Sequence, residues 1–220
     1  MSSGSPIDLD AVRFHYAPDG WSLELPSLRI GAERFTCIVG PNGSGKSTLL
    51  RLAAGLLKPV SGAVRLDGKP LSGFPRRALA RRIGFLPQES PPLFDYAVEE
   101  VVRLGRYAHS GWLGEADADG RCAVDNALSD VGLTSQRLRP LSHLSGGERK
   151  RAMIAAVLAQ ESGLLLLDEP TAALDIHHAA AVMRLLARLG RRGRAVVVVT
   201  HELNLAALFA ERLLLLVGDA

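Results

Sequence analysis

Residues 34–57, "RFTCIVGPNGSGKSTLLRLAAGLL", decide how this chain folds. The stretch begins with an apolar run rich in β-branched residues, which is typical of a strand covered on both faces. It ends with apolar residues at helical spacing. Between the two, Gly40-x4-Gly45-Lys46-Ser47 matches the phosphate-loop pattern, in the strand–loop–helix setting that the pattern requires. A plain Gly-rich turn between a strand and a helix is the weaker explanation in this setting.

This phosphate loop, residues 40–48, has the residue types that bind phosphate and a divalent metal ion. Its glycines allow successive backbone N–H groups to turn inward around an anion, and the following helix directs its positive end to the same place. We expect Lys46 to reach the β- and γ-phosphates of a nucleotide and the Ser47 hydroxyl to take a Mg²⁺ coordination position. The loop residues predicted to bind the nucleotide, which the family resemblance given below implies to be ATP, are Gly40, Pro41, Asn42, Gly43, Ser44, Gly45, Lys46, Ser47 and Thr48.

An acidic motif, "LLLLDEP" at residues 164–170, complements the loop. Asp168 ends an apolar strand run and is suited to hold the metal ion, directly or through water. Glu169 follows in the position of a base that polarises an attacking water. By itself the motif could be an acidic turn after a core strand, but the phosphate loop makes the catalytic interpretation stronger.

The motif "LSGGE", residues 144–148, indicates a second phosphate-binding surface. Ser145 and Glu148 fit a capping box at the start of a helix. A capping box does not need Gly146 and Gly147, which leave helix-start amides bare and therefore favour an anion site. Only one such surface is needed per nucleotide, so the chain carries one more phosphate-binding surface than a single nucleotide requires.

The rest of the chain alternates between strand and helix patterns. Residues up to Gly31 predict two or three antiparallel strands with a turn at 18–20, and Asp67-Gly68 predicts a second hairpin turn. Apolar strands are predicted at 83–88, 163–170 and 194–201, and helices at 76–82, 147–160, 177–190 and 203–213. This alternation indicates an α/β fold with a mostly parallel sheet.

The predicted domain organisation is one domain with an insertion. Residues 1–89 and 150–220 are expected to form the nucleotide-binding core with an N-terminal antiparallel β subdomain. Residues 90–149, which are mostly helical in pattern, are expected to form an inserted helical subdomain that ends in the "LSGGE" motif. A chain of 220 residues is long enough to bury the core that this organisation requires.

Composition is that of an ordinary globular protein. The chain has 47% hydrophobic and 22% charged residues and a formal net charge of +3. Only 5% of the residues are aromatic, which argues against a stacking platform for nucleic acid. The arginines at 76–82 and 191–194 are interpreted as solvated helix faces rather than patches for nucleic acid or lipid. No nucleic-acid partner is expected.

The cysteines and the hydropathy of the chain indicate the cellular compartment in which we expect to find it. Cys37 lies in an apolar strand and Cys122 has no partner motif, so no disulfide is expected, which fits a reducing compartment. The N-terminus has no signal pattern, and no segment reaches the roughly 18 uninterrupted apolar residues that span a bilayer. We therefore expect a soluble chain that meets a membrane only through a partner.

The motifs "GPNGSGKST", "LSGGE" and "LLLLDEPTAALD", in this order, resemble the ATP-binding cassette (ABC) ATPase family over essentially the whole chain. The resemblance implies a RecA-like P-loop core. It also implies that two cassettes pack head to tail, so that each ATP lies between the phosphate loop of one chain and the "LSGGE" serine of the other. The signature residues expected to bind the ATP of the partner chain are Leu144, Ser145, Gly146, Gly147 and Glu148.

Four further residues resemble family positions. Tyr16 matches an aromatic residue that stacks on adenine, although a tyrosine in a hairpin strand is equally ordinary. Gln88 resembles the glutamine that reaches the metal ion and the attacking water, and His201 resembles the switch histidine that contacts the γ-phosphate. Asp175 resembles the aspartate of the loop that crosses the dimer interface, and it can serve as a helix N-cap at the same time.

One subgroup fits best, the ATPases of bacterial importers for iron–siderophore complexes, haem or cobalamin. The resemblance lies in "VEEVVRLGRYAH", "LAQESGLLLLDEPTAALDIHH" and "THELNLAALFAERLLLL". It implies a peripheral subunit at the cytoplasmic face of the bacterial inner membrane. Its partners would be transmembrane permease subunits and, indirectly, an extracytoplasmic substrate-binding protein. Relatives usually continue past "LLLLVGDA" with another strand and a closing helix.

Two alternative functions remain open at this point. An ABC exporter ATPase would share every catalytic residue named above. A soluble ABC protein that acts on DNA or ribosomes would share them as well, although such proteins usually carry long coiled coils or paired cassettes, and this chain has neither.

Overall fold

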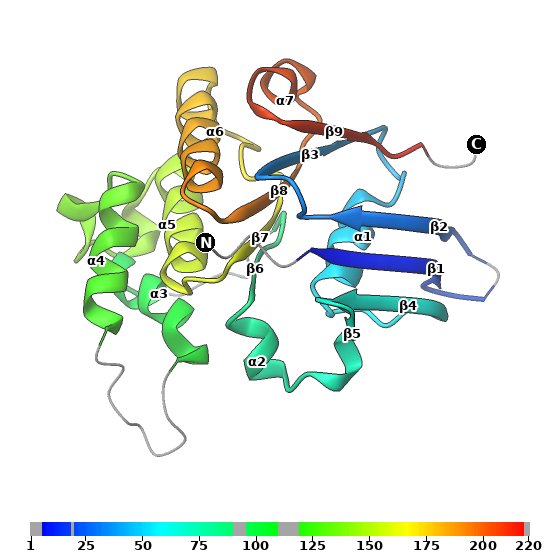
Figure 1. Ribbon diagram of the computed structural model, residues 1–220. Helices are drawn as coiled ribbons and strands as arrows, with labels where there is room; N and C mark the ends of the chain where they lie inside the picture. Colours follow the sequence, from blue (N-terminus) through cyan, green and yellow to red (C-terminus); the bar gives the residue numbers. More distant parts are fainter. Residues whose placement is uncertain (1–5, 19, 90–95, 110–118, 218–220) are drawn as a thin grey trace.

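A parallel sheet and an antiparallel sheet form the centre of the computed structural model, with helices packed on the parallel sheet (Figure 1). The structure describes residues 6–18, 20–89, 96–109 and 119–217. Its strands are β1 (Ile7–His15), β2 (Ser22–Ile30), β3 (Phe35–Val39), β4 (Ser61–Leu66), β5 (Lys69–Pro70), β6 (Ile83–Leu86), β7 (Leu164–Asp168), β8 (Ala195–Val199) and β9 (Arg212–Leu215). Its α-helices are α1 (Lys46–Ala53), α2 (Arg76–Ala80), α3 (Val98–Leu104), α4 (Gly120–Asp130), α5 (Gly146–Ala159), α6 (Ile176–Arg191) and α7 (Leu203–Phe209). Short 3-10 segments are η1 (Leu71–Gly73), η2 (Gly105–Ala108), η3 (Thr134–Gln136) and η4 (Leu141–His143).

The parallel sheet has the order β6-β7-β8-β3-β9, and every neighbouring pair in it is parallel. All residues of β3, β7 and β8 are buried, which confirms the prediction of strands covered on both faces. β6 ends at Leu86, two residues before the predicted end at Gln88. Gln88 therefore lies beyond the sheet, at the edge where the parallel strands end.

Three helices are shorter than predicted, and one of them, α2, ends at Ala80 rather than at residue 82. α1 ends at Ala53 rather than at residue 57, because Gly55 adopts a left-handed φ of 69° that closes the helix. α7 ends at Phe209, whereas helical spacing predicted a helix through Leu213. Leu213 instead lies in β9, opposite Cys37 of β3. β9 pairs with the free backbone groups at the edge of β3, and the hydrogen bonds of this pairing outweigh the local helix propensity of the β9 residues.

The antiparallel sheet is the predicted β subdomain. It has the order β2-β1-β4-β5, and β1 pairs with both β2 and β4. Between β4 and β5, φ is 51° at Asp67 and 75° at Gly68, so both residues adopt the positive φ of a type I′ hairpin turn. This confirms the predicted hairpin. The predicted turn at 18–20 lies between β1 and β2, and Asp19 within it is outside the described residues.

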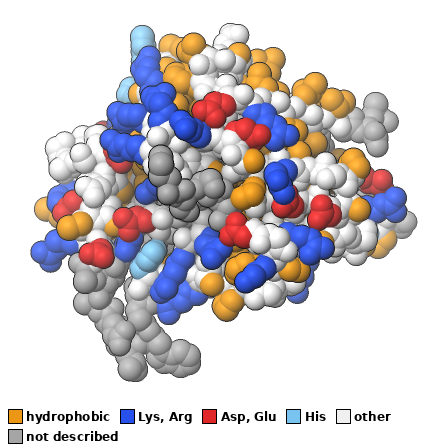
Figure 2. Space-filling view, in the orientation of Figure 1, with side chains coloured by type: hydrophobic (Ala, Val, Ile, Leu, Met, Phe, Trp, Pro, Cys, Tyr) orange, Lys and Arg blue, Asp and Glu red, His pale blue; other side chains and the backbone are white. Residues whose placement is uncertain are grey.

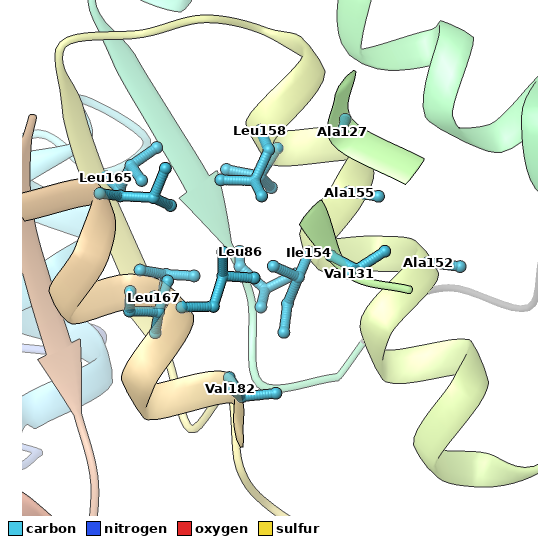
Figure 3. Packing of buried hydrophobic residues seen from close by; sticks show 14 of the residues in the cluster. Leu86, Ala127, Val131, Ala152, Ile154, Ala155, Leu158, Leu165, Leu167 and Val182 are labelled. Atoms are coloured by element: carbon cyan, nitrogen blue, oxygen red, sulfur yellow. The ribbon is translucent and has the colours of Figure 1, made fainter. Parts of the chain in front are cut away.

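Side chains of the parallel sheet alternate between two apolar cores. Leu165 and Leu167 of β7 point to the helical side, where Figure 3 shows them with Leu86 beside residues of α4, α5 and α6. Leu164 and Leu166 belong to the second core, which α1 and the antiparallel sheet complete. Because both faces of the parallel sheet are densely packed, the sheet is a rigid support for the loops at the ends of its strands.

Helices α3, α4 and α5 pack against one another (Figure 1), and we call these three helices, with the segments that connect them, the helical subdomain. The boundary predicted between residues 149 and 150 falls within α5. Segments 90–95 and 110–118 of the predicted insertion lie outside the described residues. Within the ranges that the structure describes, no helix is both long enough and apolar enough to cross a membrane.

The arginines at 76–82 are exposed, as predicted, but some also make contacts within the fold. Arg77 and Arg81 donate hydrogen bonds from Nε to the Ala108 carbonyl, at 3.1 and 2.8 Å. These two bonds connect α2 and the residue after it to η2. Part of the positive charge therefore has a structural role.

Candidate functional site

The phosphate loop encloses the Lys46 side chain between β3 and α1. Lys46 is buried, and its Nζ donates hydrogen bonds to the carbonyls of Gly40 and Pro41 at 2.9 and 2.6 Å. Gly45 has a φ of 94°, which favours glycine, and a Cβ there would lie 2.8 Å from the Trp21 ring. The loop therefore places a buried cation and the amides at the start of α1 at the end of β3.

Two aromatic side chains cover one side of this loop. The Tyr16 and Trp21 rings lie 6.4 Å apart with an interplanar angle of 29°, and the Tyr16 hydroxyl lies 3.2 Å from Thr48 Oγ1. Tyr16 thus lies at the loop, with its side chain mostly exposed. Trp21 was not predicted. The signal that could have identified it is its position directly after the turn that follows Tyr16.

The end of β7 supplies a buried carboxylate, Asp168. Its Oδ1 accepts a hydrogen bond from Ser47 Oγ at 3.1 Å, and its Oδ2 is buried without a hydrogen-bond partner among the described residues. Burial raises the pKa of Asp168, and the hydrogen bond from Ser47 acts in the opposite direction. Two of the three residues predicted to hold a metal ion, Ser47 and Asp168, are therefore in contact.

Gln88, Glu169 and His201 come together beyond the ends of β6, β7 and β8. Gln88 Nε2 donates to Glu169 Oε2 at 3.1 Å, and His201 Nδ1 lies 3.7 Å from the same oxygen. Glu169 has a φ of 48°, a left-handed value that a residue other than glycine rarely adopts. Its N–H donates to the Val199 carbonyl at 3.0 Å, so pairing with β8 holds this turn. The three side chains meet because parallel strands end at the same edge.

Lys150 of α5 is a further charged group at this edge, and it was not predicted. Its Nζ donates a hydrogen bond to the Gln88 carbonyl at 3.2 Å. Burial lowers the pKa of Lys150, while the charges of Asp168 and Glu169 act in the opposite direction. Lys150 stands 62 positions after Gln88 in the chain, so only the packing of α5 beside β6 brings them together.

A cavity of about 570 Å³ connects most of these groups. Its described lining residues are Tyr16, Trp21, Asn42, Gly43, Gly45, Lys46, Ser47, Thr48, Gln88 and Glu169. A cation, an aromatic pair and a carboxylate on its walls suit a nucleotide, which carries phosphates and a flat base. None of the described lining residues belongs to the signature residues 144–148.

The signature residues lie at the start of α5 instead. The Glu148 N–H donates to Ser145 Oγ at 3.2 Å, and the Ser145 N–H donates to Glu148 Oε2 at 2.9 Å. The Ser145 N–H and the Ser145 hydroxyl both donate to Glu148 Oε2 and thereby lower the pKa of Glu148, and the reciprocal bonds between the two residues confirm the predicted capping box. Asp175 caps α6 through hydrogen bonds from the N–H groups of His177 and His178. Both Ser145 and Asp175 are exposed, so these helix starts are open to another molecule.

Comparison with known proteins agrees with this geometry. Residues 23–172 match the family model described as ABC transporter. The chain is 44% identical over 212 residues to the hemin import ATP-binding protein HmuV of Rhodopseudomonas palustris, with 91% of this chain and 75% of that protein covered. It is 41% identical over 204 residues to the petrobactin import ATP-binding protein FpuC of Bacillus anthracis, with 92% and 75% covered.

Solved ATP-binding cassettes share the fold. A dimeric cassette in a post-hydrolysis state, bound to ADP and phosphate, has a TM-score of 0.81 at 30% identity over 97% of each chain. CbiO1 of Clostridium perfringens, part of an ABC transporter complex, has a TM-score of 0.80 at 31% identity, over 95% of this chain and 83% of that one. Because the family match includes the phosphate loop and the carboxylates after β7, this chain belongs to the ABC transporter family as one of its ATP-hydrolysing cassettes.

Proposed function

We propose that two copies of this chain pack head to tail and hydrolyse ATP at sites that both copies share. The separation of the two phosphate-binding surfaces carries this proposal: the phosphate loop, Gln88 and Glu169 line one cavity, and the exposed start of α5 at Ser145 does not line it. A second copy would bring Ser145 to the ATP held by the first. Asp175, exposed at the start of α6, would lie at the interface between the copies. The dimeric relative bound to ADP and phosphate supports this arrangement.

ATP would be held mainly by the loop. Lys46 would exchange the carbonyls of Gly40 and Pro41 for phosphate oxygens, which form stronger, charge-assisted hydrogen bonds with an ammonium group. Backbone N–H groups of the loop would point to the same phosphates. Tyr16 would stack on the adenine base, and Trp21 would support the tyrosine ring from the side of the loop.

The residues at the end of β7 fit a Mg²⁺ ion. Mg²⁺ prefers oxygen ligands, and Asp168 Oδ2 is a buried oxygen without a donor among the described residues, next to the hydroxyl of Ser47. We assign Ser47 as a direct ligand, and Asp168 and Gln88 as ligands that bind directly or through water. When bound, the ion supplies positive charge that neutralises the developing charge on the phosphates.

Glu169 would act as the base that accepts a proton from the attacking water. Gln88 and His201 both lie at its Oε2, so they can hold the carboxylate in position, and His201 would contact the γ-phosphate when ATP is bound. The left-handed backbone of Glu169 supports a functional role, because such strained positions cluster at active sites. A positioned base of this kind contributes typically about 10²–10⁴-fold to a rate.

Hydrolysis would drive a membrane importer for haem, iron–siderophore complexes or cobalamin. The relatives named above are import proteins for hemin and petrobactin, which favours import over export and over a soluble function. The chain would bind permease subunits at the cytoplasmic face of the bacterial inner membrane, and an extracytoplasmic substrate-binding protein would deliver the cargo. Leu104, Tyr107 and Leu138 of the helical subdomain are exposed apolar residues, which suits a contact surface for the permease.

Mixing two inactive variants tests the shared site. Lys46→Ala removes the cation of the phosphate loop, Ser145→Arg blocks the signature residues, and each variant should be inactive as a homodimer. In the mixed dimer one site carries both changes and the other is intact, so activity should return if one intact site suffices. Activity per chain should also rise with protein concentration until dimers predominate. A strictly monomeric chain with full, concentration-independent activity would refute the shared site.

Reconstitution into lipid vesicles tests the transport function. The chain and its permease would be placed in vesicles that contain ATP, with the binding protein and haem, a ferric siderophore or cobalamin outside. We expect ATP-dependent uptake of one of these cargoes, which Glu169→Gln should abolish. Movement of cargo in the outward direction would favour the exporter, and failure to co-purify with any permease would favour the soluble alternative.

A further inference from the structure

A groove separate from the nucleotide cavity runs between the helical subdomain and α6. Two adjoining cavities of about 480 and 590 Å³ form it, and Ser129, Asp130 and Arg192 line both of them. Residues of α4 and α5 line one side, and residues of α6 and of the segment before β8 line the other. Figure 2 shows Lys and Arg side chains gathered at the upper left of the view, where Figure 1 places α6.

Positive charge predominates in this groove. The arginines that line it are Arg151, Arg184, Arg188, Arg192 and Arg194. In the part of the chain that the structure describes, none of these five side chains forms a hydrogen bond or an ion pair. The lining acids are Asp130 and Glu161, and Glu161 already pairs with Arg106 at 2.6 Å. The groove therefore holds more positive charge than its own carboxylates neutralise.

Two of these guanidinium groups are partly buried. Arg151 Nε and Arg194 Nη1 are shielded from solvent and have no hydrogen-bond partner among the described residues. Burial lowers the pKa of Arg194, against the attraction of Glu161 and Asp130. Burial of an N–H without an acceptor, and of a charged group whose N–H groups are not all hydrogen-bonded, costs free energy. An anion in the groove would offset these costs by binding the remaining N–H groups of the same side chains.

We propose that this groove binds a soluble anion that carries two or more phosphoryl groups. Guanidinium groups bind phosphate oxygens in a bidentate manner, and positive groups spread over two cavities suit a ligand with several negative groups. A groove with partly buried arginines is less accessible to a flat lipid surface than to a small anion. None of the five arginines is among the described residues that line the nucleotide cavity, so this site is distinct from it.

A bound anion would connect the two helices that carry the proposed interface residues. Arg151 is on α5, which begins just after Ser145, and Arg184 and Arg188 are on α6, which Asp175 caps. Neutralising guanidinium groups on both helices removes their mutual repulsion and holds the helical subdomain against α6. The anion should therefore raise the melting temperature of the chain, because it binds the folded state.

Calorimetric titration with inorganic tripolyphosphate tests this proposal. The protein is the Lys46→Ala chain in buffer without Mg²⁺, so that binding at the phosphate loop is weakened. We expect this chain to bind the anion. The double change Arg188→Gln and Arg192→Gln, at two exposed side chains, should weaken binding at least about tenfold, since each removes charged hydrogen bonds. Arg191→Gln is the matched control, because Arg191 is exposed next to Arg192 and does not line the groove.

A second arginine variant and an experiment with lipid vesicles distinguish binding of a soluble anion from its alternatives. Arg184→Gln should also weaken binding, and every variant should melt at the temperature of its parent or higher in the absence of the anion. Equal affinities of the double variant and the Arg191→Gln control would overturn the proposal, as would an absence of binding by the Lys46→Ala chain. Vesicles that contain phosphatidic acid test the lipid source: arginine-dependent vesicle binding without tripolyphosphate binding would also overturn it.

Discussion

Replacing Lys150 with methionine tests whether this lysine positions the catalytic edge of the sheet. Its Nζ donates to the Gln88 carbonyl at 3.2 Å, and Asp168 and Glu169 attract the same ammonium group. A charged hydrogen bond of this kind contributes roughly 1.5–3 kcal/mol, and the half-buried position of Lys150 favours the lower end. Methionine keeps the apolar stem and removes the bond. If Gln88 and Glu169 need this support in the transition state, kcat should fall about tenfold.

Steady-state ATPase assays combined with nucleotide titrations separate catalysis from binding. Lys150 is not among the described residues that line the nucleotide cavity, so the ATP affinity of Lys150→Met should match that of the parent. Lys150→Arg should recover most of the activity, because it retains a charged donor. Arg149→Met, at the exposed neighbouring residue of α5, should keep the parent kcat. The reasoning fails if Lys150→Met and Arg149→Met have the same kcat, or if only ATP affinity changes.

Three further outcomes are expected. Glu169→Gln should keep ATP binding and lose about 10²–10⁴-fold in hydrolysis, because an amide cannot accept the proton of water; size-exclusion chromatography should show an ATP-bound dimer, and hydrolysis at the parent rate would exclude Glu169 as the base. Tyr16→Ala should weaken ATP binding about 5- to 150-fold in a fluorescence titration, as expected for loss of one base–aromatic stack, and unchanged affinity would remove Tyr16 from the adenine site. Burial raises the pKa of Cys37 to about 12, so above the pKa of the unfolded thiol the unfolded chain loses this proton first, and the free energy of unfolding falls as the pH rises toward that value. At about pH 8 the native chain should therefore react with a thiol reagent at the exposed Cys122 alone; a second fast-reacting thiol before denaturation would contradict the burial of Cys37.

The elements with local signals were predicted well. The run 164–168 is apolar enough to require cover on both faces, and the Asp67-Gly68 turn has the residues that positive φ favours. The end of α7 was predicted wrongly, because residues 210–213 have a helical pattern but lie beside the free edge of β3. The spacing of apolar residues in the sequence cannot show that an unpaired strand edge lies nearby in the fold.

Local sequence patterns were enough to predict the groups at the site: a phosphate loop around Lys46, two carboxylates at the end of an apolar run, and a capped helix start at Ser145. These features depend on residues close together in the chain, where spacing and side-chain chemistry suffice. Three contacts depend on the tertiary fold: Gln88 and His201 meet at one oxygen of Glu169, Trp21 covers the phosphate loop, and Lys150 reaches the edge of the sheet beside Gln88. The arginine groove depends on tertiary structure as well. Such contacts follow from strand order and from the packing of α5 and α6 on the sheet, which bring together residues that no local pattern relates.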